Sequence, residues 1–245
     1  MPRSNILKYA AGTYLSNIKM LLLFSLAFVI AFLIPVFASF PTYNDAGAIF
    51  LRTASIFLNL NIFSTAIIVA ALFFSLLFLS FAIVAINVIV KHGRTRTRIT
   101  REVFEGLEKY TAKVFAVLLA WAVIIIIANV LSYPTGYSGI ITAIVGLAVT
   151  PFFFYAPTSI VIDDNRLARA LDASTAFFIK RFDYFLLWLA VSIALISFFD
   201  FVFIIATGTL ASRYIMLVFN SLFIMPFLIV LQSELYMNRF SLLKR

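Results

Sequence analysis

The chain of 245 residues contains no cysteine and only one histidine, His92. Disulfides, thiolate nucleophiles and cysteine-ligated metals are therefore excluded, and cysteine usage says nothing about the redox compartment. His92 lies close to Lys91 and Arg94, which disfavours cation binding, and no second ligand accompanies it. Only ten residues are acidic. We therefore expect no metal site, no cofactor and no catalytic centre.

Charged residues are scarce in general: they make up 12% of the chain, whereas hydrophobic residues make up 64%. Soluble domains average about 25% charged and about 45–50% apolar residues. The composition is typical of an integral membrane protein and excludes a soluble enzyme. Because the hydrophobic runs are continuous and do not alternate with polar residues, the spanning elements are predicted to be helices and not strands.

Six hydrophobic segments reach or approach the length of about 20 helical residues that a hydrocarbon core of about 30 Å requires. We predict an all-α membrane protein with six transmembrane helices in three hairpins, which form a single domain over residues 1–245. The second segment is the longest and should tilt, kink or protrude from the membrane. The segments are Met20–Ala38, Ile62–Val90, Val114–Leu131, Gly139–Ile162, Tyr184–Ala206 and Tyr214–Gln232.

Lys and Arg residues gather on one side of these segments. Cytoplasmic loops of membrane proteins carry an excess of both residue types, so we predict a multi-pass protein of the cell membrane with both termini in the cytoplasm. Only Arg52 and Arg213 are assigned to the other side. The remaining seventeen of the nineteen are Arg3, Lys8, Lys19, Lys91, Arg94, Arg96, Arg98, Arg101, Lys109, Lys113, Arg166, Arg169, Lys180, Arg181, Arg239, Lys244 and Arg245.

The formal net charge of +9 also bears on the partners of the protein. Because the basic residues flank the spans, we expect them to meet anionic headgroups of the cytoplasmic leaflet and not nucleic acid. Each Lys or Arg near such a surface contributes about 1 kcal/mol of attraction. A protein partner, or membership of a membrane complex, is also expected.

Three similar basic stretches precede the odd-numbered spans: Asn5–Lys19, Thr100–Lys113 and Asp164–Asp183. In each, apolar residues recur at helical spacing, for example at Val103 and Leu107. We predict that each stretch is an amphipathic helix on the cytoplasmic face. The chain then consists of three units, each an interfacial helix followed by a hairpin, and the outer connections are Ser39–Asn61, Ser132–Ser138 and Thr207–Arg213.

Prolines interrupt two of the predicted spans. Pro151 and Pro157 should bend or break the fourth helix, and Pro226 the sixth. Breaks in the membrane can build transport sites, although proline also occurs in membrane helices that have no such role. Both interpretations remain open at this point.

Asp200 is the one carboxylate inside the fifth span, six residues from its outer end. A carboxylate in the membrane is costly and is a candidate functional group. Asp200 either pairs near the interface with Arg213 or Arg52, or lies exposed at the outer headgroup level, or belongs to an ion or proton pathway. The amides Asn87, Asn129, Asn220 and Gln232 and the hydroxyl of Ser221 are expected to form hydrogen bonds between helices, and substrate binding is the alternative.

Two short motifs resemble known families. The run Asp164-Asn165-Arg166-Leu167-Ala168-Arg169 is similar to the opening of the CDP-alcohol phosphotransferase motif, but the positions of its later Gly and two aspartates hold Phe178, Phe182 and Leu186. Ala156-Pro157 and Ala170-Leu171-Asp172-Ala173-Ser174, with one residue inserted, resemble six-helix membrane proteins of unknown function related to the membrane domain of glycerophosphodiester phosphodiesterases. That second resemblance implies a six-helix fold and no enzymatic activity.

The sequence therefore favours a non-enzymatic membrane protein that acts as a scaffold, assembly factor or accessory subunit. Its basic cytoplasmic face would carry this role through the exposed cations of the second and fourth connections, namely Lys91, Arg94, Arg96, Arg98, Arg101, Arg166 and Arg169. One alternative is a transporter or permease-like subunit with a site between broken helices. A second alternative is a metal-dependent lipid phosphotransferase.

Overall fold

A computed structural model describes residues 3–37, 42–45, 48–51, 62–93, 99–207 and 209–238. Within these residues six helical stretches are long and apolar enough to cross a membrane. This bears out the prediction of a helical, multi-pass membrane protein. The six candidate spans are Ile18–Pro35, Thr65–Gly93, Arg101–Thr135, Ser138–Ile162, Phe182–Thr207 and Ser212–Met237.

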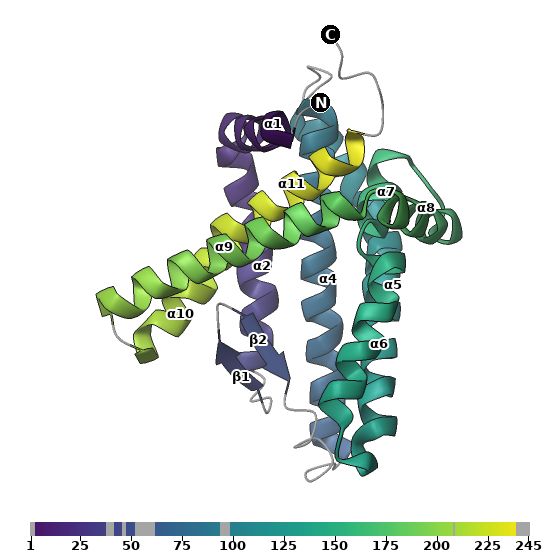
Figure 1. Ribbon diagram of the computed structural model, residues 1–245, viewed down its shortest axis with the longest axis vertical. Helices are drawn as coiled ribbons and strands as arrows, with labels where there is room; N and C mark the ends of the chain where they lie inside the picture. The colour runs from purple at the N-terminus through teal and green to yellow at the C-terminus, as the bar shows by residue number, and fades with distance from the viewer. Residues whose placement is uncertain are drawn as a thin grey trace.

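Four long helices run roughly side by side along the long axis of the molecule, and the last two cross them obliquely (Figure 1). The upright helices are α2 (Ile18–Phe37), α4 (Ile62–Gly93), α5 (Ile99–Ser132) and α6 (Ser138–Phe153). The oblique pair consists of α9 (Phe182–Thr207) and a C-terminal helix, which is made of α10 (Thr209–Phe219), the π-helical segment η2 (Asn220–Ile224) and α11 (Met225–Met237).

Shorter elements lie between the long helices. They are α1 (Arg3–Ser16), the antiparallel strands β1 (Thr42–Asp45) and β2 (Ala48–Leu51), the 3₁₀ turn η1 (Tyr133–Thr135), α7 (Ala156–Ile162) and α8 (Leu167–Lys180). The strands pair in a register that sets Thr42 opposite Leu51. The predicted turn Ser132–Ser138 contains η1. Gly136 follows η1 with a positive φ of 74°, a conformation that glycine adopts without strain.

The basic stretches meet at one end of the bundle, which we call the basic end. It is formed by α1, the end of α4, the start of α5, the α7–α8 connection and the end of α11, and it lies uppermost in Figure 1. Helix α1 packs on α11, and α7 packs on α4, α5 and α8. The largest group of buried apolar side chains lies in these elements and in α2; it includes Phe28, Ile86 and Tyr236.

The structure corrects two predicted boundaries. Thr100–Lys113 is not a separate interfacial helix, because α5 continues unbroken from Ile99 to Ser132. Val103 is fully buried, and Gly106 lies so close to α4 that an added Cβ would approach Val88 to 2.6 Å. Because this part of α5 packs against α4, the helix begins well before Val114, where the third span was predicted to start. Thr207–Arg213, predicted to be a connection, is helical from Thr209 onward.

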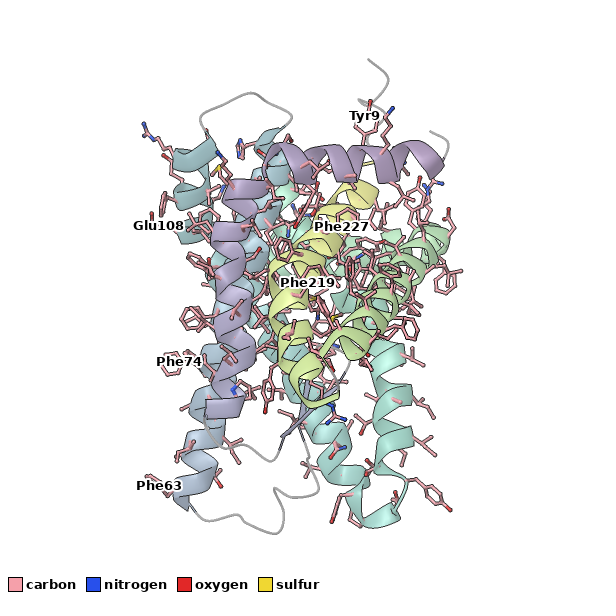
Figure 2. The ribbon with its side chains drawn as sticks, turned by 90° about the vertical axis from the view of Figure 1, so that its left-hand side faces the viewer. Tyr9, Phe63, Phe74, Glu108, Phe219 and Phe227 are labelled. Carbon is pink, nitrogen blue, oxygen red and sulfur yellow. The ribbon has the colours of Figure 1, made fainter. Side chains whose placement is uncertain are left out.

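The other two basic stretches are separate helices. Helix α1 ends at Ser16, and after a turn at Asn17 the chain enters α2 at a steep angle, so that α1 lies across the end of the bundle (Figure 2). Helix α8 buries Ala170, Ser174, Phe177 and Phe178, whereas Leu167 is 40% exposed.

The fourth span breaks where the prolines predict. Helix α6 continues through Pro151 and ends at Phe153, and α7 begins at Ala156 with Pro157 in its first turn. Proline lacks an N–H group and its ring clashes with the preceding turn, so the regular hydrogen bonds cannot continue across it. Pro226 has a related effect in the sixth span, because the wider π turn of η2 directly precedes it.

Two polar side chains bind the backbone exposed at the break in the fourth span. Gln232 Nε2 donates to the Phe154 carbonyl at 2.5 Å, and Ser174 Oγ accepts from the Tyr155 N–H at 3.0 Å. The same Ser174 hydroxyl donates to the Pro151 carbonyl at 2.9 Å. Since hydrocarbon offers no hydrogen bonds, these contacts make the break tolerable inside the membrane.

Candidate functional site

The basic end contains a connected set of polar side chains, and it is the candidate functional region. Lys91, at the end of α4, donates from Nζ to the Val161 carbonyl of α7 at 2.7 Å. Its ammonium group also lies 5.8 Å from the ring centre of Tyr110 on α5. One lysine therefore joins three helices. Of the predicted cations, Arg94, Arg96 and Arg98 lie outside the described residues.

Tyr110 is buried among three lysines. Lys109 and Lys113 place their ammonium groups 5.1 Å and 5.6 Å from its ring centre, in addition to Lys91. A cation above an aromatic face gains about 0.5–1 kcal/mol at exposed sites and more where water is excluded. The sequence predicted a basic face, and in the structure part of this charge contacts Tyr110 and the helix ends.

The connection between α7 and α8 supplies the opposite charge. Asp164 accepts from Lys109 Nζ at 2.5 Å, and this hydrogen bond lowers the pKa of the Asp164 carboxyl below its usual range. Asp164 has a φ of 54°, a conformation that aspartate tolerates better than most side chains. Its neighbour Asp163 accepts from the Tyr236 hydroxyl at 2.7 Å. The connection is thereby tied to both α5 and α11.

Glu234 is the polar residue of this region that sequence reasoning missed. It lies in α11, two residues beyond the predicted end of the sixth span, and is 3% exposed. Its Oε1 accepts from the Thr13 hydroxyl of α1 at 3.0 Å. On α1, the Tyr14 hydroxyl donates to the Phe223 carbonyl at 3.3 Å. Burial raises the pKa of this hydroxyl. The sequence signal that could have identified Glu234 is its position as an acid just after a long apolar segment.

Of the predicted polar residues of the spans, Asn87, Asn129 and Gln232 contact a neighbouring helix or the break beside it, whereas Ser221 donates to the Leu217 carbonyl of its own helix. Asn87 is fully buried on α4, and its Oδ1 accepts from the Ser233 hydroxyl of α11 at 2.7 Å. Asn129 donates to the Thr142 hydroxyl of α6 at 3.3 Å, while its Oδ1 is buried without a partner among the described residues. Asn220 is buried at the first position of η2.

Asp200 lies far along α9 and is partly exposed. Arg213, one proposed partner, is exposed on α10. The other proposed partner, Arg52, is outside the described residues. The ion pair, the exposure at headgroup level and the pathway therefore all stay predictions for Asp200.

Arg101, Arg166 and Arg169 complete the set of predicted basic residues, and all three are exposed at the basic end. Arg101 pairs along its own helix with Glu105 at 2.8 Å, whereas Arg166 and Arg169 lie at the start of α8. His92 approaches Glu102 at 3.6 Å. Within the described ranges no three His, Cys, Asp or Glu side chains come together as a possible metal site.

Comparison with known proteins identifies no relative. No protein-family model matches the chain, and neither the curated proteins nor the solved structures contain a significant match. In this fold Ala156 and Pro157, from the motif noted in the sequence, are buried at the start of α7, and Ser174 binds the helix break. These motif residues therefore have structural roles, and the family resemblance stays a prediction.

The Thr13–Glu234 contact provides a test of how α1 is held. Thr13→Val removes the donor and Glu234→Leu removes the acceptor, so each should lower the free energy of unfolding. Together they should lower it by less than their sum, with a coupling of about 1 kcal/mol. Ser16→Ala is the control, because Ser16 Oγ donates to Thr13 O and accepts from Asn17 Nδ2, and both bonds stay at the turn that ends α1. Unfolding in detergent, followed by circular dichroism, measures these values; strict additivity would contradict the contact.

Proposed function

We propose that this protein is a non-enzymatic integral membrane scaffold or accessory subunit that acts through its basic cytoplasmic face. The observation that carries the proposal is the use of polar groups inside the spans. Asn87 binds Ser233, Gln232 binds the Phe154 carbonyl, and Trp188 Nε1 donates to the Leu228 carbonyl at 2.9 Å. These side chains hold helices together and are not left over for a substrate.

The surface also supports this proposal. Exposed cations at the basic end include Lys8, Arg166 and Arg169, and large apolar side chains are exposed on α6 and α9, among them Leu147 at 73% and Ile205 at 69%. Apolar helix faces of this kind suit contact with lipid or with another membrane helix. The basic end suits anionic headgroups or an acidic region of a partner protein.

The orientation of the proposed scaffold follows the distribution of charge. We place the basic end in the cytoplasm, because Lys and Arg concentrate in cytoplasmic loops, and the η1 turn on the opposite side. We also retain the three-unit interpretation, in which an interfacial helix or helix start precedes each pair of spans. Helix α2 packs along α4, α5 along α6, and α9 along α10, as that division requires, while α4 also packs along α5 between the first two units.

A transporter or permease-like subunit is the second candidate. The break between α6 and α7 and the π turn at Asn220 are the kinds of irregularity that build transport sites. The buried Oδ1 of Asn129, which lacks a described partner, also favours this candidate. A transporter requires these groups to meet water during its cycle, whereas a scaffold does not.

Labelling of single introduced cysteines tests the proposed orientation, and the chain suits this method because it has no native cysteine. A membrane-impermeant maleimide applied outside intact cells should label Tyr137→Cys, whose parent side chain is 67% exposed near η1, and should spare Arg101→Cys. The reverse pattern would overturn the orientation.

Interior positions extend the same experiment. In opened membranes, Asn87→Cys and Asn129→Cys should resist a small water-soluble thiol reagent, while Arg101→Cys reacts as the positive control. Rapid reaction at the two interior positions would show a hydrated path and would favour the transporter.

The scaffold role also predicts a complex that depends on the basic face. In mild detergent extracts of native membranes, the protein should migrate above its own 27.5 kDa in a native gel. Arg166→Gln combined with Arg169→Gln should shift it toward the free form by weakening electrostatic contacts. Tyr137→Glu, at the opposite end, is the control. Migration as a single free chain in every variant would contradict a scaffold role.

A further inference from the structure

An apolar groove of about 390 Å³ lies on α2, α4 and α5 within their membrane-spanning parts. Its lining is almost wholly hydrocarbon: Leu23, Phe24, Leu26, Ala27, Ile30, Leu77, Phe78 and Phe81. The exception is Thr111 of α5. Its hydroxyl oxygen is buried and has no hydrogen-bond partner in the described structure.

The hydroxyl of Thr111 differs from those of Ser25, Ser75 and Ser80 on these helices, which donate to backbone carbonyls. Ser25 donates to the Leu21 carbonyl at 2.6 Å and Ser80 to the Leu76 carbonyl at 2.6 Å. A polar group that is left unpaired in an apolar site destabilises the protein. Thr111 lines the groove, and rotation about its Cα–Cβ bond would turn the covered hydroxyl toward the groove. Because the groove is apolar and lies where the solvent is lipid, the acceptor that it would meet there belongs to a hydrocarbon-bearing molecule.

The depth of Thr111 indicates which acceptor that is. Thr111 lies one turn after Glu108, which Figure 2 shows near the basic end, whereas Phe74 lies much farther along the same side. This level is the boundary between charged residues and the apolar part of α5. In a glycerophospholipid, the ester carbonyls lie at such a boundary, directly above the acyl chains.

The groove runs from this boundary into the membrane. On α2 its lining extends from Leu23 to Ile30, a helical rise of about 10 Å. Lys19 precedes Leu23 by four residues and is exposed, so it stands on the same helix face, one turn nearer the basic end. A cation is thus available where the phosphate of a bound lipid would lie. Glu108 on α5 would repel the negative phosphate. We therefore expect the phosphate to lie on the α2 side of the groove, beside Lys19.

We propose that this groove is a specific site for an anionic glycerophospholipid. One acyl chain lies between α2 and α4, the Thr111 hydroxyl donates to an ester carbonyl, and the Lys19 ammonium group meets the phosphate. The site is separate from the polar contacts that hold the basic end together, and it does not depend on the scaffold proposal.

Photolabelling tests the site directly. The full-length protein is placed in nanodiscs that contain a small fraction of phosphatidylglycerol with a diazirine on its acyl chain. After irradiation, mass spectrometry compares labelling of the groove peptides with labelling of the exposed α6 face around Ile144 and Leu147, which are 61% and 73% exposed. The groove should be labelled several-fold more per exposed side chain. Equal labelling would mean ordinary contact with bulk lipid and would overturn the proposal.

Substitutions at the hydroxyl give the sharper result. Thr111→Val keeps the shape and removes the donor, so groove labelling should fall about fivefold, as expected for the loss of one hydrogen bond. Thr111→Ser keeps the donor and should retain labelling. Leu26→Trp fills the groove from its rim, where Leu26 is 50% exposed, and should reduce groove labelling to that of the α6 face. Unchanged labelling in Thr111→Val would refute the role of the hydroxyl and with it the specific site.

The headgroup contact has its own comparison. Lys19→Gln should reduce labelling by phosphatidylglycerol severalfold, whereas Lys8→Gln, an exposed lysine of α1, should not. A phosphatidylcholine probe with the same acyl chain should label the groove more weakly than phosphatidylglycerol does. Equal labelling by the two lipids, or equal effects of the two lysine variants, would overturn the assignment of an anionic lipid.

Discussion

The break in the fourth membrane helix sets the constraint on which the rest of the structure depends. Helix α6 ends at Phe153, and the backbone groups exposed before α7 need partners that hydrocarbon does not provide. Gln232 of α11 and Ser174 of α8 supply them. Two elements distant in the sequence must therefore dock at the break before the fourth span can be stable in the membrane.

The docking of α11 at the break also positions the other contacts of the basic end. Within one and a half turns after Gln232, Ser233 binds Asn87, Glu234 accepts from Thr13, and Tyr236 donates to Asp163. Aromatic rings pack around these hydrogen bonds. The rings of Tyr155 and Tyr236 are stacked, with 5.8 Å between their centres. The end of α11 thus joins α1, α4 and the α7–α8 connection, and exposed basic residues are displayed on a rigid base.

The sequence predicted what depends on composition and local chemistry: six apolar helices, the break near Pro157 and the turn around Gly136. It did not predict which polar groups meet, since Gln232 and Phe154 are 78 positions apart and periodicity shows only which face is buried. The apolar stripe that contains Val103 was identified, but whether lipid or α4 covers it depends on tertiary packing. For the same reason Glu234 was not recognised.

Amide hydrogen exchange at Tyr155 tests the central claim most directly. If Ser174 accepts from the Tyr155 N–H, this amide at a helix break should exchange as slowly as that of Ile160, which is fully buried inside α7. Ser174→Ala should accelerate its exchange by at least about tenfold, because the hydrogen bond is lost. Exchange at Tyr155 as fast as at Gly136 in the exposed η1 turn, with no effect of Ser174→Ala, would contradict the account.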